Sequence, residues 1–280
     1  MSIFNRYFKE GPGVEKDAPQ KNRFFLFFEL FGRKFTKLIL LNVLYFLMLI
    51  PFIIGGLMTF SINPNIITDG AINLALIKVL PPIVFSGDII GTIIFALSFI
   101  IAGPATAGFV YVIRNFQNQE HSWVRSDFFE QFKLNFKQGA LIGIIDFIAF
   151  LAGFIALNFY IYIAKTISPD MVSMSPVLIG IVLMLIIIYT WMHYYIHLMM
   201  VTFDLSTKEI MKNALLFSIG KLPLNVLITF ICGVIFLLAM FYIPTRITLI
   251  LTVLILLSFV GYIITFSVYP TVEKYMIKGR

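Results

Sequence analysis

The stretch KNRFFLFFELFGRKFTKLILLNVLYFLMLIPFIIGGLMTF (Lys21–Phe60) combines the two features that decide the fold of this chain. Its first part is aromatic and basic, and its second part, Leu38–Phe60, is a continuous apolar run. A helix rises about 1.5 Å per residue, so about 20 apolar residues cross a bilayer core of ~30 Å. The stretch therefore predicts a helix at the membrane surface, within residues 1–37, that leads into a transmembrane span.

Five more apolar blocks of similar length follow in a chain that is 60% hydrophobic and only 12% charged. Because these blocks are continuous rather than alternating, they indicate helices and not barrel strands. The sequence thus predicts an all-α, polytopic transmembrane helical bundle, which forms a single domain over residues 38–280. The six predicted spans are Leu38–Phe60, Ile89–Ile113, Ala140–Ala164, Val177–Val201, Leu224–Tyr242 and Ile247–Tyr269.

Basic residues sort onto one side of these spans. Eighteen of the 21 Lys and Arg residues lie in the N-terminal segment, the second and fourth connections and the C-terminal tail. The other three, Lys78, Lys165 and Arg246, lie one in each remaining connection. By the positive-inside rule, this alternation predicts that both termini are cytoplasmic, and it supports an even number of spans.

The connections are too short for a soluble catalytic or nucleotide-binding domain. No phosphate loop, nucleophile elbow or dinucleotide-binding glycine pattern is present, so we expect no enzymatic activity and no cofactor. The net charge of +7 does not indicate nucleic-acid binding, because the basic residues flank spans. The single cysteine, Cys232, excludes an intrachain disulfide and a cysteine metal cluster. The longest external connection, Ser61–Asp88, is apolar enough to predict a short surface helix.

Two connections on the basic side predict short amphipathic helices. In the first, Ser126 is placed to cap a helix that carries an aromatic face. That face consists of Phe129, Phe132 and Phe136. In the second, Ser206 and Glu209 have the spacing of a capping box, and Ile210 and Phe217 follow on an apolar stripe. Both helices are candidates either for docking a cytosolic partner or for packing against the protein's own bundle.

Proline and small residues interrupt the first two predicted spans. Proline lacks a backbone N–H and therefore frees a carbonyl one turn earlier, whereas small residues let another helix approach closely. The pattern predicts a packing notch at a kink, and a solute path lined by freed carbonyls is the alternative. The residues concerned are Pro51, Gly103, Pro104, Ala107 and Gly108.

Polar residues inside the spans are few, and three of them form a candidate site. Asp146 is the only acidic residue within a predicted span, where a charge is costly and indicates function. His193 and His197 are four residues apart, so they share a helix face at a depth comparable to that of Asp146. Three interpretations remain open: a polar lock between spans, a proton or ion relay, or a two-ligand metal face without an evident third ligand.

Three motifs resemble a known family. They are GPATAGFVYVIRNF (Gly103–Phe116), EHSWVRSDFFEQFKLNFKQG (Glu120–Gly139) and VTFDLSTKEIMKNALLF (Val201–Phe217). Together with LILLNVLYFLMLIP (Leu38–Pro51), they are similar to the YesL-like family of bacterial membrane proteins, a domain of unknown function.

The resemblance implies a location and a role but no catalytic residues. It implies a multi-pass protein of the bacterial plasma membrane, in contact with the lipid bilayer and without nucleic acid. It also implies an association with carbohydrate ABC importers or with membrane sensor kinases. From this we expect an accessory or permease-like subunit linked to carbohydrate uptake. The alternatives are a self-contained proton- or ion-coupled carrier of small solutes and a membrane scaffold for a signalling kinase.

Overall fold

The computed structural model describes residues 22–62, 83–85, 88–166 and 169–277. Within these ranges, six helical segments are long and apolar enough to cross a membrane, which confirms the predicted number of spans and the all-α class. These segments are Arg23–Thr59, Ile89–Gln117, Phe136–Tyr160, Met174–Met200, Leu222–Phe241 and Thr245–Ile277.

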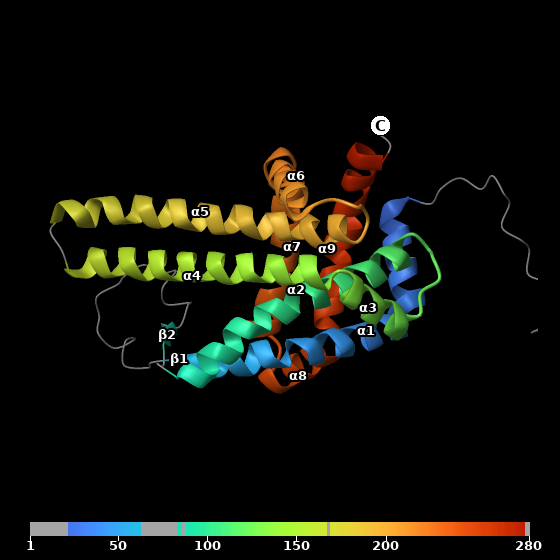
Figure 1. Ribbon diagram of the computed structural model, residues 1–280, viewed down its shortest axis with the longest axis horizontal. Coiled ribbons are helices and arrows are strands. Elements are labelled where there is room, and N and C mark those ends of the chain that lie inside the picture. Colours follow the sequence, from blue (N-terminus) through green and yellow to red (C-terminus); the bar gives the residue numbers. More distant parts are fainter. Residues whose placement is uncertain (1–21, 63–82, 86–87, 167–168, 278–280) are drawn as a thin grey trace, which may run out of the picture.

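The first helix, α1 (Arg23–Thr59), is longer than its predicted span. It includes the basic aromatic stretch that precedes Leu38, and it continues through Pro51. At 1.5 Å per residue it is roughly 55 Å long, well beyond a bilayer core of ~30 Å. Figure 1 shows its dark blue first part at a steep angle to the remainder, so the predicted surface helix and the first span are one bent helix.

A short antiparallel pairing joins the end of α1 to the start of α2 (Ile89–Gln117). Its two strands are β1 (Phe60–Ile62) and β2 (Ile83–Phe85). The surface helix predicted for this connection falls mainly on residues 63–82, which lie outside the described part of the chain, as do residues 1–21.

The middle of the chain forms a short helix and a long helical hairpin. The short helix α3 (Val124–Leu134) is followed directly by α4 (Phe136–Thr166), and α5 (Pro169–Met200) returns beside α4. In Figure 1, α4 and α5 run along the long axis of the molecule, with α1 and α2 on one side of them.

The predicted cap of α3 is wrong. The helix begins at Val124, two residues before Ser126. Asp127 closes its first turn instead, because its carboxylate accepts hydrogen bonds from the Trp123 N–H (3.1 Å) and the Ser122 hydroxyl (2.6 Å). The start of α3 is therefore stabilised by the Asp127 carboxylate and not by a cap at Ser126.

The last part of the chain crosses the others. Helix α6 (Thr207–Gly220) leads into α7 (Leu222–Phe241), and Pro244 separates α7 from α8 (Thr245–Leu251), between the fifth and sixth predicted spans. The chain then continues through the π-helix η3 (Thr252–Leu256), α9 (Leu257–Val272) and a second π-helix, η4 (Glu273–Ile277). In the view of Figure 1, α7 and α9 run across the direction of α4 and α5.

A buried asparagine on α1 holds the irregular turn of this last span. The Asn42 amide donates to the carbonyls of Thr252 (2.8 Å) and Val253 (2.7 Å), and its oxygen accepts from the Ser258 N–H (2.7 Å). A π-helix leaves backbone groups without their usual helical partners, and lipid offers none. Asn42 supplies those partners and so fixes the last span against α1.

Candidate functional site

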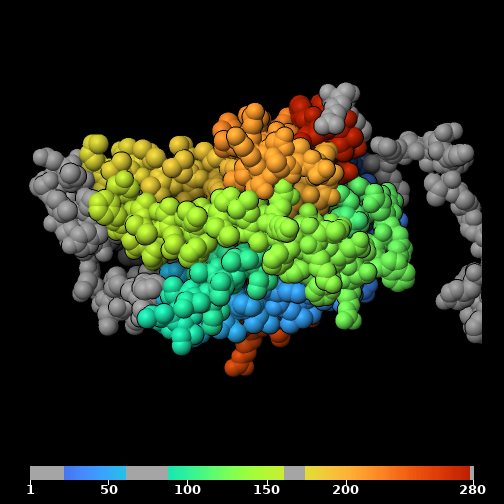
Figure 2. Space-filling view, in the orientation of Figure 1, coloured from blue at the N-terminus to red at the C-terminus, as the bar shows by residue number. Residues whose placement is uncertain are grey.

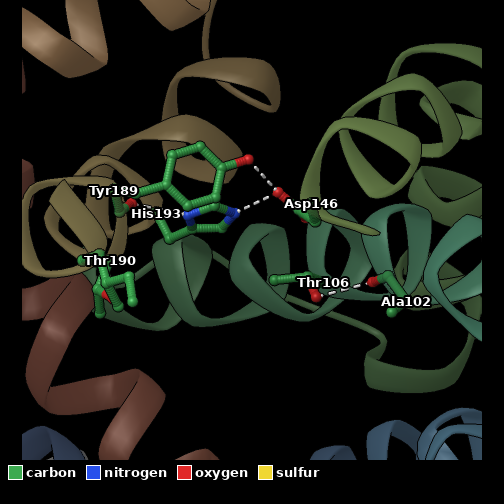
Figure 3. Close-up of polar contacts among 7 residues, drawn as sticks. Ala102, Thr106, Asp146, Tyr189, Thr190 and His193 are labelled. Atoms are coloured by element: carbon green, nitrogen blue, oxygen red, sulfur yellow. Dashed lines mark hydrogen bonds and ion pairs between the residues drawn. The ribbon is translucent and has the colours of Figure 1, made fainter. Parts of the chain in front are cut away.

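The α4–α5 hairpin brings Asp146 and His193 together. His193 Nε2 lies 2.9 Å from Asp146 Oδ1, so the two predicted residues form a direct contact between neighbouring spans. The hydroxyl of Tyr189, one turn before His193 on α5, donates to the same carboxylate oxygen at 2.6 Å. Figure 3 shows the Tyr189 and His193 side chains pointing from α5 toward Asp146 on α4.

The protons of this cluster follow from the tautomer of His193. His193 Nδ1 lies 3.0 Å from the Tyr189 carbonyl, which can only accept, so Nδ1 carries a hydrogen whenever this hydrogen bond is formed. The contact between Nε2 and Asp146 Oδ1 then needs one more proton between the two atoms. That proton sits either on the imidazole, giving an ion pair, or on the carboxyl, giving a neutral pair. In both forms the pair shares one proton, and its net charge is zero.

His197 lies one turn further along the same face of α5. Its side chain is buried, and Nε2 is buried without a hydrogen-bond partner in the structure. The rings of His193 and His197 are 6.0 Å apart between centroids, which is too far for a direct hydrogen bond but within reach of one bridging water. A buried polar atom without a partner is unusual and marks this position as part of the polar site.

Arg114 continues the polar track where α5 ends. This residue, near the end of α2, donates to the Val201 carbonyl at 2.6 Å, directly after the last residue of α5. The Val201 N–H in turn bonds to the His197 carbonyl at 3.1 Å. Asp146, His193, His197 and Arg114 therefore follow one another from within the spans toward the end of α5.

The other side of α5 is polar too, and this was not predicted. Trp191 Nε1 donates to Thr229 Oγ1 on α7 (2.8 Å), and the Tyr195 hydroxyl donates to Asn225 Oδ1 (2.7 Å). Both side chains are buried between α5 and its neighbours.

The small residues of α2 lie at its closest contacts with other helices. A Cβ on Gly103 would overlap the Gly139 carbonyl of α4, and a Cβ on Gly108 would overlap the Phe128 carbonyl of α3. Ala107 and Pro104 are buried beside them. The proline of α1, Pro51, lies within a continuous helix.

The residues predicted to dock a partner differ in how far they are buried in the structure. Ile210 is fully buried in the core under α6, so it is not on a surface that a partner could contact. Phe217, Phe129 and Phe132 are partly buried against the protein's own core. Phe136 belongs to α4 rather than α3 and remains 41% exposed.

Within the described residues, no group of three or more His, Cys, Asp or Glu side chains is arranged to hold a metal ion. Four residues that were not predicted as part of a site also make hydrogen bonds between spans: Tyr189, Thr229, Asn225 and Asn42. Their signal was present, since a polar side chain inside an apolar block needs a partner in lipid. The sequence did not indicate which residue on another span would be the hydrogen-bond partner.

The fold and this site define a multi-pass helical membrane protein with a polar cluster between two spans. Comparison with protein families adds one match: the family described as "Protein of unknown function, DUF624" matches residues 22–159. This match covers just under half of the chain and is consistent with a YesL-like membrane protein, and it confirms the resemblance for the three motifs that lie within residues 22–159. Comparisons with curated proteins and with solved structures found no match.

Proposed function

We propose that the protein is a proton-coupled carrier of a small solute, with the Asp146–His193 pair as its proton-binding site. The observation that carries the proposal is the 2.9 Å contact between His193 Nε2 and Asp146 Oδ1, which places two ionisable groups against each other between neighbouring spans. Imidazole changes its charge near neutral pH, and ionisable groups within spans commonly serve as proton relays.

Release of the shared proton changes the contact between the two helices. Without it, the neutral imidazole has one hydrogen for two acceptors, Asp146 Oδ1 and the Tyr189 carbonyl, so one of these two hydrogen bonds is lost. Tyr189 donates to the same oxygen, so it holds the carboxylate in place while the proton leaves. The proposal is that this change lets α4 and α5 move relative to each other, and that the movement accompanies solute transfer.

His197 and Arg114 give the proton a direction. The unpartnered Nε2 of His197 is a place where a bridging water, and then a proton, can be accepted. Arg114 stabilises the last turn of α5 through the Val201 carbonyl. The proposed path runs from Asp146 and His193 past His197 toward the end of α5 that Arg114 holds.

A liposome assay tests the carrier. Purified protein is reconstituted with an entrapped pH-sensitive dye, and a panel of small sugars is added outside, because the family resemblance connects the chain with carbohydrate uptake. We expect a sugar-dependent acidification inside that Asp146→Asn abolishes and the surface variant Lys208→Gln, at an exposed position of α6, retains. Sugar-dependent proton movement that persists in Asp146→Asn would remove the pair from the mechanism.

A second candidate function is an accessory subunit of a carbohydrate importer. The observation that favours it is the outer face of α6, where Leu215, Leu216 and Ile219 are exposed while Ile210 is buried. Copurification from the native host tests this proposal. Loss of importer subunits in Leu216→Asp, with the protein still inserted in the membrane, is the expected result, and an unchanged set of partners would contradict it.

A further inference from the structure

A groove between α1 and α3 has the composition of a lipid headgroup site. It has a volume of about 950 Å³ and lies where the basic part of α1 meets the start of α3. Its charged lining residues are Lys37, Arg125, Lys133 and Glu130, so three cations face one carboxylate. Figure 2 shows the green surface of α3 beside the blue surface of α1.

The cations of this groove are available to a ligand. Lys37 donates to the Ser122 carbonyl at 3.1 Å, which fixes it at the wall of the groove but leaves its charge unneutralised. Arg125 and Lys133 are exposed and form no ion pair with the described residues. The nearby carboxylate of Asp127 is already engaged by the Ser122 hydroxyl and the Trp123 N–H. The groove therefore has an excess of positive charge that suits an anion.

An apolar track leads from the groove along the span. Leu40 lines the groove, and Leu47 and Ile54 follow it at intervals of seven residues, so the three share one face of α1. They are exposed by 47%, 53% and 47% respectively. From Leu40 to Ile54 the track rises about 21 Å, more than half of a bilayer core of ~30 Å.

We propose that this groove binds the phosphate headgroup of an anionic phospholipid, whose acyl chain lies along Leu40, Leu47 and Ile54. The charge excess selects the headgroup, because Lys and Arg near the membrane surface attract anionic lipids. The apolar track selects a lipid over a soluble anion or an acidic peptide, since neither of these follows a span into the bilayer. Trp123 is 72% exposed at the groove, a position that suits an indole at the level of the headgroups.

Trp123 also provides the measurement. The chain contains two tryptophans, so in Trp191→Phe the indole of Trp123 is the only one left. This full-length variant is reconstituted in phosphatidylcholine bilayers that contain an increasing share of brominated lipid, either phosphatidylglycerol or phosphatidylcholine. We expect bromine on phosphatidylglycerol to quench Trp123 at several-fold lower lipid fraction than bromine on phosphatidylcholine.

Charge variants connect this preference to the groove. Each cation near the surface accounts for about a fivefold difference in affinity. Arg125→Gln combined with Lys133→Gln should therefore reduce the preference until the two brominated lipids quench equally. Lys208→Gln combined with Lys212→Gln, two exposed positions on α6, lowers the net charge equally and should retain the preference. Both side chains of the groove pair are exposed, so folding is not expected to change.

Four results would overturn the proposal. They are equal quenching by the two lipids in the starting protein, an equal loss of preference in the α6 control, removal of the preference by millimolar inorganic phosphate, and displacement of the lipid by a soluble acidic peptide. The third result would identify a site for free anions, and the fourth a site for a protein partner.

Discussion

Helix α4 has two interfaces that are built on opposite principles. Toward α2 it presents Gly139 and Gly143, which let the two backbones touch. Toward α5 it presents Asp146, which reaches His193 and Tyr189 through hydrogen bonds. The first interface depends on the absence of side chains, and the second depends on particular side chains and on one proton.

This difference indicates which neighbour of α4 is able to move. Contacts between glycine backbones do not change with pH, and their dispersion energy is lost if the helices separate slightly. A hydrogen bond that needs a shared proton has two states, with and without that proton. In the proposed mechanism, the α2–α4 pair is therefore the fixed frame of the protein, and the α4–α5 pair is the interface that a proton alters.

The largest expected effect comes from filling the glycine interface. In Gly143→Val, the new side chain would overlap the Phe99 carbonyl, which belongs to a rigid helix and cannot move aside. Overpacking costs about 1–3 kcal/mol in ordinary cores, and we expect this variant to lie at the upper end of that range or beyond it. The measurement is the monodispersity of the protein after detergent extraction, and we expect Gly143→Val to lose it.

A glycine elsewhere on α4 provides the matched control. At Gly153 the nearest atom to a new Cβ is the end of the Ile186 side chain, at an ordinary 3.4 Å. Gly153→Val should therefore remain monodisperse. If Gly143→Val and Gly153→Val are equally monodisperse, the α2–α4 contact is not the fixed frame of the protein.

Substitutions at the α4–α5 interface should have a smaller effect on stability, and the effects at Asp146 and His193 should be coupled. In Asp146→Ala, His193→Ala and the double variant, the free energy of unfolding is measured by titration with a denaturing detergent. We expect a coupling of about 1–2 kcal/mol, because hydrogen bonds between membrane helices are modest even when they are well formed.

A second pair of substitutions, at residues that make no contact with each other, controls for general destabilisation. The Tyr194 hydroxyl contacts Thr229 Oγ1 at 3.0 Å and does not contact Asp146. Asp146→Ala combined with Tyr194→Phe should be additive within about 0.5 kcal/mol. Coupling of equal size in both cycles would mean that the helices respond as a whole, and that the Asp146–His193 contact has no separate energy.

The sequence predicted the fold well because hydrophobic length and charge act locally. Each span could be recognised from its own residues, and the Pro244 turn and the Ser206–Glu209 capping box are likewise encoded within a few positions. The sequence predicted that a surface helix leads into the first span, but it did not predict that the two form one continuous helix. The basic residues between Arg23 and Leu38 do not interrupt α1.

The site was predicted only as far as helix periodicity allows. Spacing placed His193 and His197 on one face, and depth placed Asp146 near them, but rotation about each helix axis is set by packing partners distant in sequence. For that reason the spacing indicated His193 but not Tyr189, whose hydroxyl reaches the same carboxylate. The hydrogen bonds of Trp191 and Tyr195 could not be predicted either, because an aromatic side chain looks the same in sequence whether Thr229 and Asn225 lie beside it or lipid does.

The smallest expected effect is a pH dependence of the stability of α6, outside the spans. It provides a second titrating contact beside the one between α4 and α5. At the start of α6, hydrogen bonds from the Ser206 hydroxyl and backbone N–H to the Glu209 carboxylate lower the pKa of that carboxyl. A carboxylate with a lowered pKa stabilises the folded helix above its unfolded pKa of about 4.3, and this contribution disappears as pH falls through the folded pKa. Hydrogen-exchange protection at the first turn of α6 should therefore decrease only in acid.

Glu209→Gln separates this effect from the α4–α5 contact. Glutamine keeps the capping-box geometry without a titrating group, so α6 protection in this variant should not change with pH. Any loss of stability between pH 6 and pH 8 that survives in Glu209→Gln then arises elsewhere, and its disappearance in His193→Ala would assign it to the shared proton. If α6 itself loosens near neutral pH, a titration at this surface helix reaches into the physiological range, and the α4–α5 contact is not the distinctive pH-sensitive interface.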